Sequence, residues 1–132
     1  MTNAKILVYS CSGCSSAAQM ANKIAIGLDR KGIAEMSCVA GVGGGVAPIV
    51  KKAKEADYII GIDGCPLACV KACLKQQGLV PSQYYELNSM GVQKKIHENF
   101  DLSQAVELEY LIARDVTHKL NEFNKAKTKS AA

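Results

Sequence analysis

The sequence predicts an α/β fold: a single three-layer domain with a four-stranded, mostly parallel sheet of strand order 2-1-3-4 and helices on both faces. Three observations lead to this prediction. Apolar runs that are typical of buried strands occupy residues 5–9 and 58–62. Each run is followed by a turn and then by apolar residues at helical spacing. Such alternation favours parallel strands joined by right-handed helical crossovers.

The first half of the chain begins with a strand at residues 5–9 and a turn at residues 10–16. Ser15 is the expected N-cap of the first helix, because a serine hydroxyl can accept a hydrogen bond from a first-turn amide. Gly32 is expected to end that helix at Lys31. A second strand follows at residues 33–39, nearer the sheet edge because it is less uniformly apolar.

Residues 40–46 are rich in glycine, but their spacing matches no phosphate-binding motif. We interpret them as a flexible connection fitted against the cysteine-containing turns. Pro48 then opens a second helix over residues 49–56, and the third strand follows at residues 58–63.

The last part of the chain contains a helix from Cys65 to residue 77, ended by Gly78, and a short strand at residues 84–88. A polar connection at residues 90–99 leads to a capping box at residues 101–104 and to a long amphipathic helix. The domain is expected to span residues 1–124, and the basic residues 125–132 are expected to be a disordered tail.

Three cysteines recur at every fourth position directly after the third strand: Cys65, Cys69 and Cys73. Pro66 suits the first position of a helix, so the helix is predicted to begin at this point. All three sulfurs would then lie on one helix face. A second pair, Cys11 and Cys14, occupies the turn after the first strand.

Ligands of open α/β sheets bind beyond the carboxyl ends of the strands, where the strand order reverses. In the order 2-1-3-4 this point lies between strands one and three, which lead into the two cysteine-containing turns. The turns are therefore expected to meet in space. Cys38, at the end of strand two, is expected at the same edge.

Four thiolates can bind a tetrahedral Zn²⁺ with Zn–S distances of about 2.3 Å. An intact helix would separate Cys65 from Cys73 by about 12 Å, so these two could not share one ion. The preferred ligands are Cys11, Cys14, Cys65 and Cys69. Cys38 is the first substitute, and Cys73 is expected beside the site or in the core.

The remaining polar candidates have weaker claims. Asp63 could orient a ligand or cap the turn that follows it, and both roles stay open. His97 and His118 are expected to be solvated or structural. A phosphatase of the cysteine-nucleophile type is excluded, because it needs an arginine five residues after its nucleophile. The residue five positions after Cys11 is Ser16, and the residue five positions after Cys14 is Gln19.

Three blocks of this chain resemble the DGC-domain family, which is named for its Asp-Gly-Cys motif. They are residues 63–73 (DGCPLACVKAC), residues 11–16 (CSGCSS) and residues 38–44 (CVAGVGG). The resemblance extends over about residues 5 to 100. It implies a small domain that binds zinc through its cysteines, and it leaves the cellular role open.

The leading functional hypothesis is a cytoplasmic zinc-binding protein whose thiolate site, at the carboxyl edge of the sheet, serves metal sensing or delivery. One alternative is a thiol–disulfide or persulfide-transfer enzyme that uses Cys11 and Cys14, since the chain has more thiols than one zinc ion needs. A second alternative is an iron–sulfur cluster, which also takes four thiolates.

The composition limits the classes of binding partner and the cellular compartment that we expect. The net charge of +4 owes much to three lysines near the C-terminus, and no basic patch with interleaved aromatic residues occurs, so we expect no nucleic-acid partner. The apolar runs are too short to span a bilayer, which predicts no membrane partner. Without a signal peptide, six cysteines suggest metal or redox chemistry in the cytoplasm.

Overall fold

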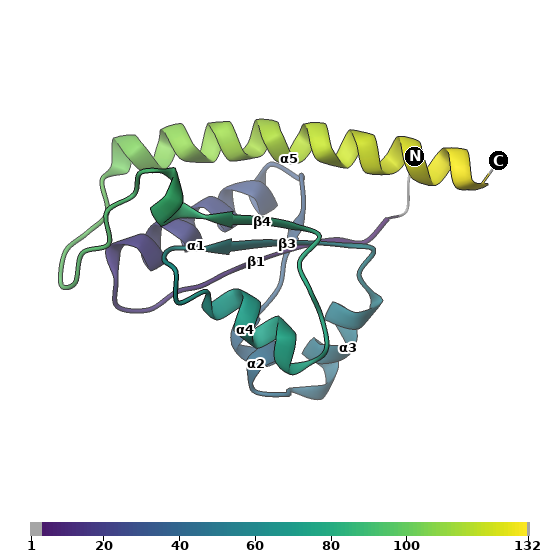
Figure 1. Cartoon of the computed structure of the whole chain (residues 1–132), viewed down its shortest axis with the longest axis horizontal. Coiled ribbons are helices and arrows are strands. Elements are labelled where there is room, and N and C mark those ends of the chain that lie inside the picture. The colour runs from purple at the N-terminus through teal and green to yellow at the C-terminus, as the bar shows by residue number, and fades with distance from the viewer. Residues whose placement is uncertain (1–3, 132) are drawn as a thin grey trace.

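The computed structural model describes residues 4–131, which form three layers (Figure 1). Four strands make the middle layer: β1 (Ile6–Ser10), β2 (Glu35–Met36), β3 (Tyr58–Asp63) and β4 (Gln83–Glu86). Neighbouring strands all pair in parallel, in the order β2-β1-β3-β4. The predicted α/β class and strand order are therefore confirmed.

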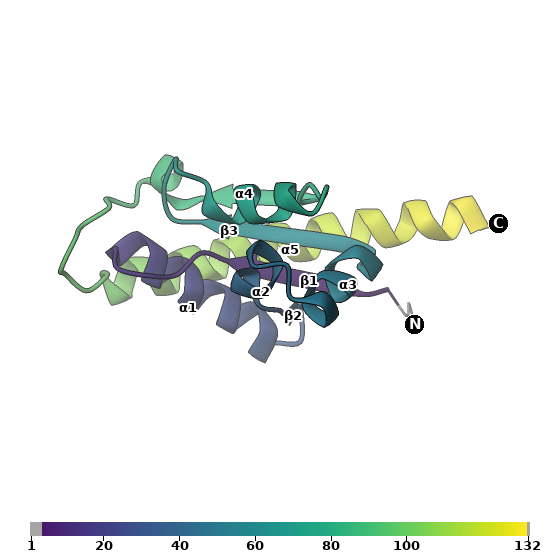
Figure 2. The same cartoon turned by 90° about the horizontal axis from the view of Figure 1, so that it is seen from below.

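Helices cover both faces of this sheet. One face carries α1 (Ser16–Arg30) and α5 (Leu102–Ala131), and the other carries α2 (Val39–Gly43), α3 (Ala47–Glu55) and α4 (Cys69–Gln76). Figure 2 shows the second group from its own side. A short 3-10 helix, η1 (Leu87–Met90), follows β4. No helix within residues 4–131 has the length and apolar character needed to cross a membrane.

The hydrophobic core surrounds β3, whose six residues are all buried. On one face α1 contributes small and branched side chains at helical spacing, including Ala21, Ile24 and Leu28. The inner face of α5 contributes Leu108 and Ile112, among others. These contacts show that the sheet and its helices have a continuous apolar core of their own.

Two elements in the middle of the chain differ from the sequence prediction. β2 is only two residues long, and the glycine-rich residues after it form the helix α2 rather than a flexible loop. A Cβ at Gly43 would lie 2.7 Å from the sulfur of Cys73, so the glycine allows α2 to pack directly on α4. The glycines thus serve close helix packing.

The C-terminal segment also differs from the expectation of a disordered tail, because α5 continues through residues 125–131. Phe123 packs against Tyr58 with ring centroids 5.0 Å apart, and Lys127 forms an ion pair with Asp57 at 3.3 Å. Lysine and alanine also favour helix. Local propensity and two contacts to the start of β3 therefore keep this segment helical.

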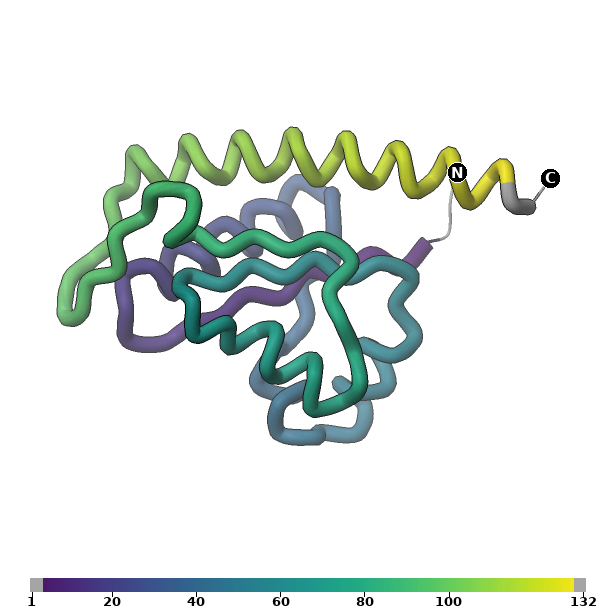
Figure 3. The backbone as a smooth tube through the Cα atoms, viewed as in Figure 1, coloured from purple at the N-terminus to yellow at the C-terminus, as the bar shows by residue number. Residues whose placement is uncertain are grey.

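The carboxyl ends of the strands share one edge of the sheet, on the left in Figure 1. The turns that lead into α1 and α4 lie at this edge. Figure 3 shows that the connection between η1 and α5, residues 91–101, passes beside them. The described ends of the chain lie at the other end of the molecule.

Candidate functional site

The turn between β1 and α1 has the predicted conformation. Ser15 is the N-cap of α1, and its hydroxyl accepts a hydrogen bond from the Ala18 amide at 3.1 Å. Cys11 is buried at the end of the strand, whereas Cys14 is exposed. Burial raises the pKa of the Cys11 thiol to about 11, in spite of a 3.1 Å hydrogen bond that its sulfur accepts from the Gly64 amide.

The turn between β3 and α4 differs from the prediction that Pro66 begins the helix. α4 begins at Cys69, and Ala68 before it adopts a left-handed conformation with φ 54°. Cys65 therefore lies in the turn and shares no helix face with Cys69 or Cys73. The expected separation of about 12 Å between Cys65 and Cys73, which assumed an intact helix between them, no longer applies.

Asp63 explains why the helix begins late. Its carboxylate is 1% exposed and accepts hydrogen bonds from the amides of Val70 at 2.9 Å and Lys71 at 3.4 Å. These amides belong to the first turn of α4, which Ala68 has no side chain to cap. Asp63 also accepts a 2.8 Å hydrogen bond from Tyr84, and burial together with this contact raises the pKa of the Tyr84 hydroxyl. The capping role of Asp63 is thus the one observed.

The two turns are in direct contact. A Cβ on Gly64 would lie 2.6 Å from the backbone carbon of Ala17, so only glycine lets the second turn approach α1 this closely. The amide of Cys11 donates to the carbonyl of Ile62 at 3.1 Å. The prediction that the turns meet is confirmed.

A cavity of about 150 Å³ lies where the two turns meet. The four cysteines preferred as ligands all line it: Cys11, Cys14, Cys65 and Cys69. With the side chains as they stand, no three or more His, Cys, Asp or Glu residues within the described part of the chain are close enough together to hold a metal ion. Coordination would need the sulfurs to turn toward one another, and metal binding stays a prediction.

The other two cysteines lie outside this cavity. Cys38 occupies the N-cap position of α2 and lines a neighbouring cavity of about 550 Å³, which it shares with Ser10 and Ser12. Cys73 lies one turn after Cys69 on α4 and faces α2, and burial raises the pKa of its thiol. The structure therefore places both beside the site rather than in it.

Lys94 is a charged residue of this site that the sequence analysis missed. It lines the cavity, and its Nζ donates to the sulfur of Cys65 at 3.5 Å. In the sequence it lies in a polar connection with no chemical motif. His97 is exposed nearby but does not line the cavity, and His118 pairs with Glu122 on the outside of α5.

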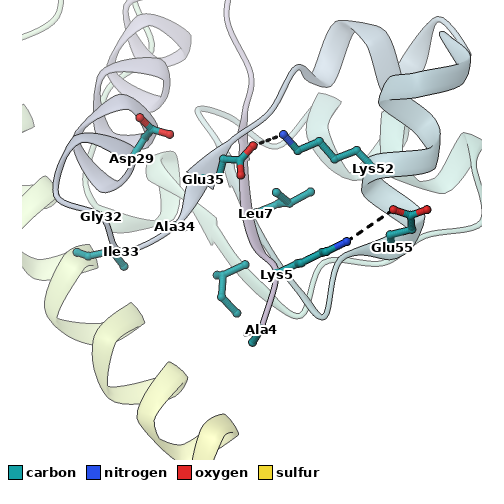
Figure 4. Close-up of a pocket in the computed structure, with 11 residues that line it drawn as sticks. Ala4, Lys5, Leu7, Asp29, Gly32, Ile33, Ala34, Glu35, Lys52 and Glu55 are labelled. Atoms are coloured by element: carbon teal, nitrogen blue, oxygen red, sulfur yellow. Dashed lines mark hydrogen bonds and ion pairs between the residues drawn. The ribbon is translucent and has the colours of Figure 1, made fainter. Parts of the chain in front are cut away.

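A larger cavity, of about 570 Å³, lies beside the amino ends of β1 and β2 (Figure 4). Its charged groups are already paired: Lys5 with Glu55 at 3.8 Å, Lys52 with Glu35, and Asp29 with Arg30 outside the cavity. None of its lining residues is a cysteine or histidine. We therefore place the candidate site at the cysteine-lined edge instead.

Comparisons with known proteins identify the family of this chain. The sequence model of the DGC domain matches residues 7–127. The Anaerobic and virulence modulator AnvM of Pseudomonas aeruginosa is 47% identical over 110 residues, which cover 80% of this chain and 84% of the relative. No solved structure matches the chain.

Proposed function

The chain belongs to the DGC-domain family, and from this premise we propose that it is a cytoplasmic regulatory protein that binds one zinc ion through Cys11, Cys14, Cys65 and Cys69. The observation that carries the proposal is that these four cysteines, from turns more than fifty residues apart, line one cavity. Four thiolates from two turns are a ligand set that suits tetrahedral zinc. The name of the relative, a modulator, favours a regulatory use of such a site.

The residues of the site have different roles in metal binding. Of the four ligands, Cys11 has the largest cost to overcome, because its buried thiol must lose a proton and is hydrogen-bonded to Gly64. Asp63 holds the first turn of α4 and with it the backbone of Cys69. A bound zinc ion would supply a charged centre whose presence changes the local structure.

We favour sensing or delivery over a purely structural role, because the apolar core is complete around β3 without a metal. A zinc finger without its metal unfolds, since its binding energy is its folding energy. Here the metal-free protein is expected to keep its helices, which far-UV circular dichroism before and after chelation would show.

Elemental analysis of protein purified without added metal tests the proposal. We expect about one zinc per chain in the parent protein and in Cys38→Ser, the matched control outside the cavity. Cys65→Ser should lose tight binding. Iron with a visible absorption band would favour a cluster, and less than about a tenth of an equivalent of any transition metal would contradict metal binding altogether.

A second candidate function is reversible thiol oxidation at Cys11 and Cys14. Two observations favour it. Among the described residues, no group of His, Cys, Asp or Glu side chains is arranged to hold a metal ion, and Cys14 is exposed whereas Cys11 is buried. In this reaction an oxidant takes two electrons and two protons from the thiols as the S–S bond forms. A metal-free protein that loses two hydrogens on oxidation, and regains them with a dithiol reductant, would support it.

A further inference from the structure

The outer face of α5 carries large apolar side chains that are exposed to solvent. Eight such side chains are exposed on the described part of the chain, and four of them belong to this helix: Leu102, Val106, Tyr110 and Leu111. The first three are four residues apart and therefore form one row along the helix. Their exposed fractions are 62%, 55% and 58%. Single exposed apolar side chains are common, but a row along one helix face is typical of a contact surface.

No other element of the described chain covers this row. The buried side of α5 is a different one, on which Leu108, Ile112 and Val116 pack into the core. Figure 1 shows α5 along the upper border of the molecule, with the other elements all below it. The row therefore faces solvent and leaves room for a second helix beside it.

Two unlike charges flank the row at similar distances from Tyr110. Glu107 lies three residues before Tyr110 and Arg114 lies four residues after it, and both are exposed. They are two helix turns apart, so they lie on the same side of the row. Neither forms an ion pair with a side chain that the structure describes. Arg114 lies over the Tyr110 ring, with its Cζ 5.7 Å from the ring centre.

This arrangement is complementary to itself in a two-fold pair. In two antiparallel α5 helices that cross at Tyr110, Glu107 of one copy lies about 4.5 Å from the crossing point along the helix axis. Arg114 of the second copy lies about 6 Å from that point in the same direction, so opposite charges face each other. Two-fold symmetry forms this ion pair twice. A parallel pair would bring like charges together instead.

The charges also argue against a lipid surface as the occupant of this face. A helix that lies on a membrane has a wide apolar face bordered by lysine and arginine. Here the apolar row is narrow, and the carboxylate of Glu107 borders it. A second copy of α5 already has both the apolar row and the matching charges that this face needs.

We propose that the outer face of α5 binds a second copy of this chain, with the two helices antiparallel and crossing at Tyr110. Val106 and Tyr110 of each copy form the apolar centre, and two Glu107–Arg114 ion pairs fix the direction. One helix face buries less area than a standard interface, so we expect a weak dimer with a dissociation constant of about 10–100 μM. Because α5 begins at the cysteine-lined edge of the sheet, the two candidate sites lie on opposite sides of the two-fold axis.

Sedimentation velocity of the full chain, from about 1 to 500 μM, measures the association. A phosphine reductant is present throughout, because exposed cysteines could otherwise join two copies through a disulfide. We expect a reversible change from monomer to dimer. Tyr110→Ser removes the apolar centre and should weaken the dimer at least about ten-fold. Leu111→Ser is the matched control, because Leu111 is exposed on α5 but lies off the row, and it should change the dissociation constant less than about two-fold.

An exchange of charges tests the antiparallel direction. Glu107→Arg and Arg114→Glu each place like charges opposite each other twice, so each variant alone should associate at least about ten-fold more weakly than the parent. An equal mixture of the two variants should recover the parent affinity, because the mixed dimer again has two pairs of unlike charge. The double variant should recover it too. Circular dichroism of each variant checks that α5 stays folded.

The outcomes decide the proposal without reference to metal content. A parent protein that stays monomeric at every concentration overturns it. If that monomer sediments with anionic vesicles and Tyr110→Ser abolishes this binding, the face contacts lipid instead. A dimer that both single charge variants leave intact, or that their mixture does not restore, overturns the antiparallel arrangement. The proposed zinc site stands or fails separately, since none of these variants changes a cysteine.

Discussion

The two turns that carry the candidate ligands look alike in the sequence and differ in the structure. Each follows a buried strand, contains cysteines and leads into a helix. In the first, α1 begins directly after Ser15, as predicted. In the second, α4 begins at Cys69, after a turn in which Ala68 adopts a left-handed conformation.

The difference lies in where each helix finds its cap. Ser15 adjoins α1 and caps it with its own side chain, so the start of the helix is visible in the sequence. α4 is capped by Asp63, which belongs to the strand and is separated from its partner Val70 by the whole turn. A cap from outside the helix lets the intervening residues fold as a turn, and Cys65 in this turn lines the same cavity as Cys11.

The contact between the turns can be broken at Gly64. We expect Gly64→Ala to lower the free energy of unfolding by about 3 kcal/mol, because its Cβ would overlap backbone atoms of Ala17 and Ala18 that cannot rotate away. Urea unfolding followed by circular dichroism measures the loss. The same variant should separate the cysteines and lose any bound zinc.

Gly44→Ala is a suitable control, because its Cβ would meet only the Ala40 carbonyl oxygen, at 3.2 Å. Its cost should stay below about 1 kcal/mol. Equal losses in the two glycine variants would mean that the turns are not held together at Gly64.

The two caps can be compared by removing each side chain. Asp63→Ala should cost about 2.5 kcal/mol, because it leaves the buried Val70 amide, the partly exposed Lys71 amide and the Tyr84 hydroxyl without this acceptor. Ser15→Ala should cost about 1 kcal/mol, the usual value for one local cap. Thermal or urea unfolding of the metal-free proteins gives both numbers.

The order of these two losses is the critical result. If Ser15→Ala costs as much as Asp63→Ala, the cap from β3 is no stronger than a local one, and the late start of α4 needs another cause. Tyr84→Phe adds a finer test, since it removes only one of the three contacts to Asp63.

The pH dependence of stability in the metal-free protein tests whether the Cys11 thiol is buried. Its pKa is raised from 9.0 to about 11, so between these values the folded protein keeps a proton that the unfolded chain has lost. The free energy of unfolding should therefore fall as the pH rises from 9, by about 2 kcal/mol once pH 11 is reached. Unfolding by urea at a series of pH values would show the decline.

Two cysteine variants test whether Cys11 causes this fall in the free energy of unfolding. Tyr84 and Tyr85, whose pKa values are also raised from 10.0, contribute mainly above pH 10, so the window from pH 9 to 10 reports thiols. Because burial also raises the pKa of the Cys73 thiol, the comparison is made in a Cys73→Ala background. In that background Cys11→Ala should remove the decline between pH 9 and 10, whereas Cys14→Ala, at an exposed thiol, should keep it. A decline that survives when both Cys11 and Cys73 are replaced would contradict the assignment.

Much of the fold was predictable because its signals are local. The apolar run of β3 and the periodic apolar residues of α1 lie next to the residues that start and stop these elements. The strand order then followed from the handedness of crossovers. The second strand was predicted but is shorter than expected, and the helix α2 was not predicted, because Gly43 makes its contact with Cys73 on another helix.

The candidate site was predictable to a similar degree. Topology alone brings Cys11, Cys14, Cys65 and Cys69 to one edge of the sheet, and the structure puts all four around one cavity. The place of Lys94 could not be predicted, because it depends on the docking of residues 91–101 onto Ser16, far away in the sequence. The exclusion of Cys38 from the cavity likewise depends on packing.

The sequence by itself determined which strands are parallel, in what order they pair and at which edge the cysteines gather, because hydrophobic periodicity and chain connectivity decide these features. Only the tertiary structure decided where α4 begins, which charge faces the sulfurs and which thiols are left out. Those features depend on contacts between different elements of the fold: Asp63 of β3 with the amides of α4, Gly64 with α1, and Lys94 with Cys65. Such contacts have no periodic signature, because each joins two segments whose relative placement is set by packing.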